Sequence, residues 1–126
     1  GRIVNIASVH GLVGSVNKSA YVAAKHGVVG LTKVTALETA GMGITANAIC
    51  PGWVRTQLVE KQIDDLAAKA GISTDAAARE LLGEKQPSLQ FVTTEQLGGT
   101  AVFLASDAAA QVTGMSIPVD GGWTAR

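Results

Sequence analysis

Apolar and polar positions divide this chain into short apolar runs separated by longer stretches of helical periodicity. Three runs are short and rich in branched side chains, as in strands buried on both faces: Arg2 to Ala7, Ile44 to Ile49 and Ser116 to Val119. Between them, apolar residues recur every three to four positions, as along one face of a helix. Strands that alternate with helices usually pair in parallel, so the pattern predicts an α/β fold on a parallel sheet.

The longest predicted helix covers Ser19 to Thr39, and Gly41 and Gly43 end it before the next strand. At 1.5 Å per residue, about 20 residues give a length of roughly 30 Å. Larger apolar side chains follow helical spacing along it: Val28, Leu31 and Val34. Small residues would let another backbone approach closely, either the sheet or a second helix: Ala20, Ala23, Ala24, Gly27 and Gly30.

Three shorter helices are predicted in the second half of the chain. Gln57 to Ala70 and Thr74 to Leu82 form a pair separated by a Gly-Ile-Ser sequence. Leu97 to Ala105 follows Thr93 or Thr94 with Glu95 and Gln96, which resembles a capping box. The 126 residues are domain-sized but supply only these three strands. We therefore expect a piece of one domain rather than several domains.

Charge and composition exclude several classes of partner. Ten acidic and ten basic side chains cancel, so no basic field favours nucleic acid or an anionic membrane. No apolar run approaches the roughly 20 residues of a membrane span, and we expect a cytoplasmic setting. Cys50 is the only cysteine, which excludes an internal disulfide and predicts a small buried apolar residue. With two separated histidines, it forms no credible metal site.

Candidate chemistry gathers around Ser8, Tyr21 and Lys25. Tyr21 and Lys25 are four residues apart at the head of the long helix, so they share one helix face. A neighbouring ammonium favours the phenolate, and Tyr21 can then exchange a proton with a substrate oxygen. Ser8 ends the first strand, at the sheet edge where ligands bind in open α/β folds. The alternative is an aromatic ring that merely packs on an aliphatic lysine stem.

These residues resemble the signature of the short-chain dehydrogenase/reductase family, a Ser at a strand end followed by Tyr-x-x-x-Lys. Further matches span most of the chain: Asn47-Ala48-Ile49-Cys50-Pro51-Gly52-Trp53-Val54-Arg55-Thr56, Thr113-Gly114 and Val119-Asp120-Gly121-Gly122. The resemblance implies the C-terminal half of a Rossmann-like, doubly wound sheet. The family's glycine-rich pyrophosphate turn and the Asn of its catalytic tetrad have no counterpart here, so we expect an N-terminal half to be absent.

The resemblance also implies roles for individual residues. Tyr21 would be the catalytic acid/base, Lys25 would stabilise the phenolate and hold the nicotinamide ribose of NAD, and Ser8 would position the substrate oxygen. The nicotinamide would be lined by Pro51, Gly52, Val54 and Thr56. In the family the long helix packs on a second subunit, which implies a homotetramer, and residues 57–90 form a substrate lid.

Within the family the chain resembles a narrower group that oxidises short 3-hydroxy acids such as D-3-hydroxybutyrate. Such a substrate needs a charge-assisted clamp for its carboxylate. Lys18 can supply the cation and His10 a hydrogen bond, with Gln62 as a further donor from the lid. Gln57, Gln86 and Gln90 are the alternatives to Gln62. Trp53 would wall the pocket, and Trp123 would pack either locally or at a neighbouring subunit's site. A solvent-exposed Lys18 and a packing role for His26 are the alternatives.

We therefore expect reversible hydride transfer between NAD and a short 3-hydroxy acid. Two other functions stay open. A 3-oxoacyl carrier-protein reductase shares the catalytic groups but needs an open channel for a long substrate arm. A non-catalytic oligomerisation fragment is the third hypothesis, because the first strand would expose an unpaired edge.

Overall fold

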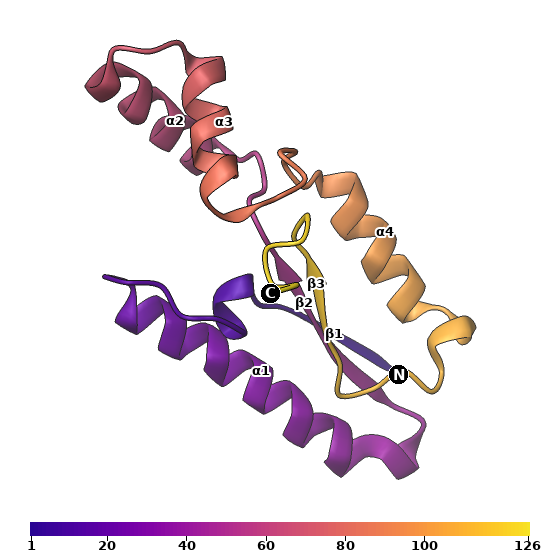
Figure 1. The fold of residues 1–126 in the computed structure, drawn as a ribbon. Coiled ribbons are helices and arrows are strands. Elements are labelled where there is room, and N and C mark those ends of the chain that lie inside the picture. The colour runs from indigo at the N-terminus through magenta and orange to yellow at the C-terminus, as the bar shows by residue number, and fades with distance from the viewer.

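The computed structural model describes residues 1–126 and contains a three-stranded parallel sheet. The strands are β1 (Arg2–Ile6), β2 (Thr45–Pro51) and β3 (Ser116–Val119), in the order β1-β2-β3. Val4 of β1 pairs with Asn47 of β2. The three strands run in one direction because a helix-containing connection crosses the sheet between each pair (Figure 1). This confirms the predicted α/β class.

Helices cover both faces of the sheet. The helix α1 (Ser19–Thr39) lies on one face and α4 (Thr94–Ala105) on the other, which gives three layers (Figure 1). A hairpin of α2 (Gln57–Ala70) and α3 (Thr74–Lys85) projects beyond the carboxyl end of β2. None of these helices is long and apolar enough to cross a membrane.

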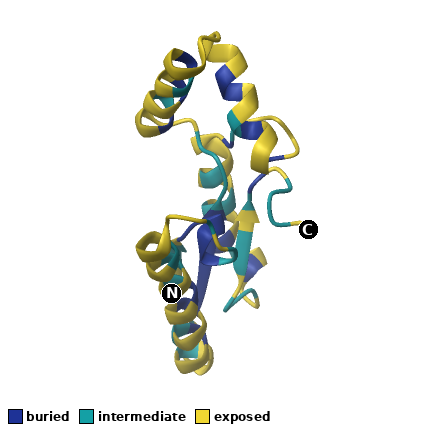
Figure 2. Ribbon diagram, turned by 60° about the vertical axis from the view of Figure 1, so that its left-hand side comes forward, coloured by how far each residue is buried: buried dark blue, intermediate teal, exposed yellow.

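The central strand β2 forms the core of the sheet. Six of its seven residues are buried, as the dark blue centre of Figure 2 shows. Cys50 is completely buried and packs in a cluster with Ala7, Val29 and Ala48. The prediction of a buried apolar cysteine is confirmed, and burial raises the pKa of its thiol. At one edge of the sheet, β1 pairs only with β2, and its residues Ile3 and Ile6 are exposed.

The predicted bounds of α1 are confirmed, and the structure shows which of its faces lies on the sheet. The residues that it buries are Val29, Thr32 and Ala36, whereas Leu31 and Val34 are 61% and 50% exposed. The sheet accepts the smaller side chains because the backbones lie close; a Cβ added to Gly114 would be 3.4 Å from that of Ala36. The small residues of α1 are also exposed and do not pack on the sheet: Ala20, Ala23, Ala24, Gly27 and Gly30.

The α2–α3 hairpin has a small apolar core of its own, so it is a folded unit beside the sheet. The buried residues of this core are Val59, Ile63, Ala67, Ala77 and Ala78. Side-chain hydroxyls begin both helices: Thr56 accepts from the N–H of Val59, and Ser73 from the N–H of Ala76. Gly71 ends α2 in a left-handed conformation, with φ at 66°.

Other predicted boundaries differ by a few residues. The α3 helix continues to Lys85, three residues beyond the predicted Leu82. The predicted capping box at α4 is confirmed with Thr93 as its first residue, because Thr93 and Gln96 bond each other's backbone N–H groups at 3.1 and 2.9 Å. These caps leave few helix ends unsatisfied, which fixes where the connecting loops start.

Candidate active site

The predicted site residues meet at one cavity beyond the carboxyl ends of β1 and β2. It has a volume of about 680 Å³. Its lining contains eleven of the twelve residues predicted for catalysis, cofactor and substrate: Ser8, His10, Lys18, Tyr21, Pro51, Gly52, Trp53, Val54, Thr56, Gln62 and Trp123. Lys25 is the exception, since it lies one turn below Tyr21 on α1. Residues far apart in the sequence are therefore brought to one place by the parallel sheet.

Ser8 begins a single 3₁₀ turn, Val9–Gly11, directly after β1. Its hydroxyl oxygen accepts the backbone N–H of His10 at 3.1 Å, which orients the side chain and leaves its own O–H free to donate. Gly11 lets this turn rest directly on α1. A Cβ there would lie 2.9 Å from the carbonyl oxygen of Lys25, and 2.9 Å from Val29.

Tyr21 and Lys25 adopt the predicted relationship on α1. The Lys25 Nζ atom is 5.7 Å from the centroid of the Tyr21 ring. The phenol lines the cavity and is 47% exposed, so a substrate oxygen can reach it. The Nδ1 atom of His26, the next residue, donates to the carbonyl oxygen of Val22 at 3.0 Å, and His26 does not line the cavity.

His10 is a buried residue of the cavity lining that contacts two other aromatic rings. Its ring is edge-on to Tyr21, at 5.7 Å and 77°, and to Trp123, at 5.4 Å and 86°. Burial lowers the pKa of the imidazole, and the charges of Lys18 and Lys85 lower it further. A neutral His10 carries one N–H that it can donate into the cavity.

Lys18 and two tryptophans, Trp53 and Trp123, also line the cavity. The Lys18 Nζ atom lies 5.9 Å from the centroid of the Trp53 ring. Asn17, in the left-handed region at φ 63°, turns the chain just before it. Trp53 and Trp123 pack with ring centroids 5.9 Å apart. Within this chain, the Trp123 ring contacts both His10 and Trp53.

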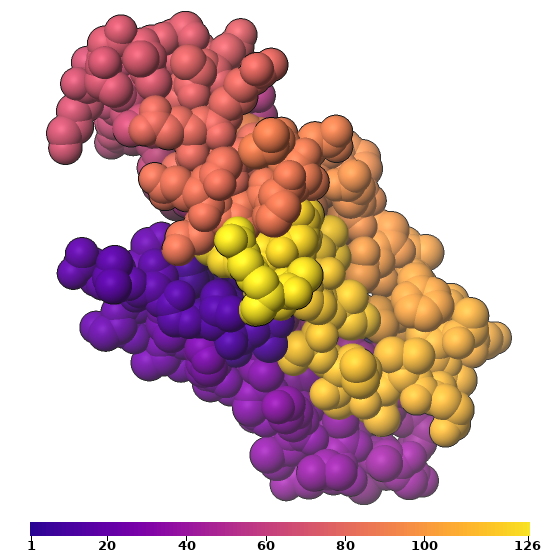
Figure 3. All heavy atoms as spheres, in the orientation of Figure 1, coloured from indigo at the N-terminus to yellow at the C-terminus, as the bar shows by residue number.

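Two residues that hold this cavity together were missed from the sequence, Gln86 and Asp120. The Asp120 carboxylate accepts the backbone N–H groups of Gly122, at 3.0 Å, and Thr124, at 2.9 Å. It thereby closes the turn that carries Trp123, and Figure 3 shows this C-terminal segment, in yellow, between the N-terminal segment and the loop after α3. The Asp-Gly-Gly sequence was the signal for Asp120. Gln86 gives no such signal.

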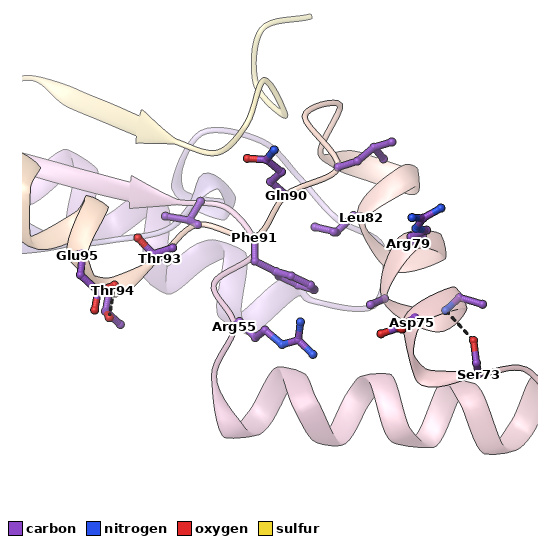
Figure 4. Close-up of a pocket in the computed structure, with 14 residues that line it drawn as sticks. Arg55, Ser73, Asp75, Arg79, Leu82, Gln90, Phe91, Thr93, Thr94 and Glu95 are labelled. Carbon is purple, nitrogen blue, oxygen red and sulfur yellow. Dashed lines mark hydrogen bonds between the residues drawn. The ribbon is translucent and has the colours of Figure 1, made fainter.

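A second, larger hollow of about 840 Å³ lies between α3 and the start of α4 (Figure 4). None of the predicted site residues lines it. Arg55 stacks over Phe91 there, 5.5 Å from the ring centroid, and forms an ion pair with Glu60. That ion pair raises the pKa of Arg55. Because neither Ser8 nor Tyr21 lines it, this hollow is a weaker candidate for catalysis than the smaller cavity.

The sequence and structure of the whole chain match known proteins. Residues 1–124 match the family described as enoyl-(acyl carrier protein) reductase. A short-chain dehydrogenase family protein from Francisella tularensis superposes with a TM-score of 0.91 at 33% identity, over 100% of this chain and 52% of that one. The chain belongs to the short-chain dehydrogenase/reductase family.

The curated members of this family that resemble the chain include two named D-beta-hydroxybutyrate dehydrogenase. The protein from Cupriavidus necator is 65% identical and that from Rhizobium meliloti 56%, each over 126 residues. The chain spans about half the length of these relatives, 49% in both cases. Among solved short-chain dehydrogenases, a polyketide ketoreductase with NADPH and a 4-hydroxyisoleucine dehydrogenase with NADH superpose at TM-scores of 0.87 and 0.84. Both forms of the cofactor therefore occur among its structural neighbours.

Proposed function

We propose that residues 1–126 form the C-terminal half of an NAD-dependent dehydrogenase that interconverts D-3-hydroxybutyrate and acetoacetate. The observation that carries this proposal is that Ser8, Tyr21, Lys18 and His10 line one cavity. It combines a proton-transfer pair with a cation in a space of about 680 Å³, which suits a small molecule. The 65% identity to the Cupriavidus necator protein of that name supports the same substrate.

Catalysis would rest on three residues of this chain. In the oxidation direction, the Tyr21 phenolate accepts the proton of the 3-hydroxyl group, and the Ser8 O–H donates a hydrogen bond to the same oxygen. The Lys25 ammonium stabilises the phenolate from one turn below. In the reduction direction, Tyr21 returns the proton to the developing alkoxide.

One part of the cavity lining would hold the nicotinamide ring. Pro51, Gly52, Val54 and Thr56 line it, and its apolar side chains can cover a flat ring and keep water from the reacting carbon. When NAD is bound there, it supplies the hydride acceptor for the substrate carbon. Lys25 would hold the ribose hydroxyls through its ammonium group.

The substrate carboxylate would lie between Lys18 and His10. The Lys18 ammonium supplies the charge, and neutral His10 a directional N–H. Gln62, on the cavity side of α2, adds an amide donor when the hairpin of residues 57–90 closes as a lid. The Trp53 and Trp123 rings limit the length of the substrate.

A 3-oxoacyl carrier-protein reductase is the second candidate, favoured by 42% identity over 122 residues to a Streptomyces virginiae protein named as a polyketide synthase ketoacyl reductase. The paired tryptophans argue for the shorter substrate, because a long thioester arm would have to pass them.

We also propose that the enzyme is a homotetramer, which the exposed small residues of α1 support.

The test measures NAD reduction by the full-length enzyme with D-3-hydroxybutyrate, L-3-hydroxybutyrate and a 3-hydroxyacyl thioester, for wild type and Lys18→Ala. We expect turnover of the D-acid, with kcat/KM reduced about 10- to 100-fold in the variant, the loss expected for a hydrogen bond to a charged group. Lys61→Ala, on the exposed side of α2, is the control. Turnover of the thioester alone would overturn the small-acid assignment and leave Ser8, Tyr21 and Lys25 as catalysts. A parallel run with NADP tests the cofactor.

A further inference from the structure

The side chain of Gln86 is completely buried at the end of α3. A buried amide is costly unless both of its ends are bonded. Its Oε1 atom accepts the backbone N–H of Trp53 at 2.8 Å, and its Nε2 atom donates to the carbonyl of Gln90 at 2.5 Å. Because an N–H only donates and a carbonyl only accepts, these two partners also determine which way the amide points.

Gln86 also fills the space left by two glycines. A Cβ added to Gly52 would lie 2.5 Å from the Gln86 Oε1 atom, and one added to Gly121 would lie 2.8 Å from its Cγ atom. The C-terminal turn is tied to the same loop, since the Ser88 N–H donates to the carbonyl of Gly121 at 3.0 Å. Gln86 thus lies between the segment that carries Trp53 and the segment that carries Trp123.

The indole of Trp53 does not fix its own position through a polar contact. Its Nε1 atom is buried without a hydrogen-bond partner. Its backbone makes two bonds instead, the N–H to Gln86 and the carbonyl to the N–H of Val92, at 2.8 Å each. The bond to Gln86 is the one that connects Trp53 to the C-terminal turn.

We propose that Gln86 is a positioning residue for substrate binding, which holds Trp53 and Trp123 at the spacing that closes the cavity around a short hydroxy acid. This rests on the proposed function. Gln86 does not line the cavity and touches neither Ser8 nor Tyr21, so it acts through the aromatic pair. Its loss therefore weakens substrate binding more than it slows proton and hydride transfer.

The first variant is Gln86→Met in the full-length enzyme, which keeps the side-chain length and removes both hydrogen bonds. We expect KM for D-3-hydroxybutyrate to rise about tenfold with kcat within about twofold, the signature of lost uniform binding. The near-ultraviolet circular dichroism of the Trp53–Trp123 pair should weaken as well, and Trp53→Phe identifies that signal. Gln57→Met, at the exposed start of α2, is the matched control and should change neither.

Gln86→Glu supplies a conservative rescue. Burial raises the pKa of such a carboxyl; protonated, it can still accept from Trp53 and donate to Gln90, while ionised it repels the Gln90 carbonyl. The ratio of its KM to that of wild type should therefore lie near one at low pH and rise with pH. Gln86→Asn, whose amide is one methylene short, replaces Gln86→Met if that variant does not fold.

Three results for Gln86→Met would overturn the proposal. These are a fall in kcat as large as the rise in KM, a lower melting temperature with KM unchanged, or an unaltered tryptophan dichroism signal. The dichroism signal needs no substrate, so it separates this proposal from the proposed function. Absent turnover of D-3-hydroxybutyrate by wild type would count against the function, whereas the aromatic signal of Gln86→Met would still decide the role of Gln86.

Discussion

The rings of His10 and Trp123 meet edge-on at 5.4 Å, although they come from opposite ends of the chain. His10 follows β1 and Trp123 follows β3, so the contact bridges the two outer strands across the carboxyl end of β2. It closes the cavity over Ser8 and Tyr21 and buries the imidazole, which is 6% exposed. The electrostatic state of His10 is therefore set by tertiary packing.

The first prediction concerns acid stability. The pKa of His10 is lowered from 6.5 in the folded state, by burial and then by Lys18 and Lys85. Below that value the unfolded chain binds a proton that the folded chain resists, so the free energy of unfolding falls as the pH falls through the interval between the two pKa values. Melting temperatures from pH 7.5 to 5 should drop less steeply for His10→Gln than for wild type. The exposed His26→Gln is the control, and equal slopes for His10→Gln and wild type would contradict the prediction.

The second prediction concerns the close contact between Gly11 and α1. In Gly11→Ala the new methyl group meets the Lys25 carbonyl at 2.9 Å, so the turn that carries Ser8 must move away from Tyr21. A displacement near 1 Å of a reacting group can cost about 100-fold in rate. Steady-state kinetics should show a lower kcat with KM changed less. Gly14→Ala is the matched control because a Cβ there meets nothing within 4 Å; an equal loss in both variants would argue against this explanation.

The third prediction tests the turn that places Trp123. Asp120 is 8% exposed and also accepts the Thr124 hydroxyl at 2.6 Å, besides the two backbone N–H groups. In Asp120→Asn the amide NH₂ group replaces an accepting oxygen, so one of the N–H or O–H donors that Asp120 binds loses its acceptor. This should lower the free energy of unfolding by about 1 to 3 kcal/mol. Denaturant titration measures that loss, and KM for the hydroxy acid should rise because Trp123 shifts. Asp64→Asn, exposed on α2, should be neutral.

Local spacing was enough to predict that Ser8, Tyr21 and Lys25 lie close together, and most elements of the fold. Their catalytic roles are part of the proposed function. Tyr21 and Lys25 are related by helix geometry alone, and Ser8 by its place at the end of an apolar run. Gln86 could not be predicted in this way, because its partners lie far away in the sequence: Trp53 and the turn that Asp120 closes. Several other glutamines also carry the same local pattern. The buried face of α1 could not be predicted either, since hydrophobic periodicity does not distinguish a face that packs on the sheet from one that stays exposed.

The exposed face of α1, with its small residues, is the basis of the last prediction, which concerns assembly. A Cβ at Gly27 or Gly30 meets nothing within 4 Å in this chain, and Leu31 beside them is 61% exposed. Gly30→Leu should therefore fold normally yet block a helix from another subunit, because close helix contact needs small residues. Light scattering after size-exclusion chromatography should show a smaller species than wild type. Gly41→Leu, equally open but past the end of α1, should leave the mass unchanged. If Gly30→Leu keeps the wild-type mass, the subunit interface lies elsewhere, and the exposed apolar edge of β1 is the next surface to test.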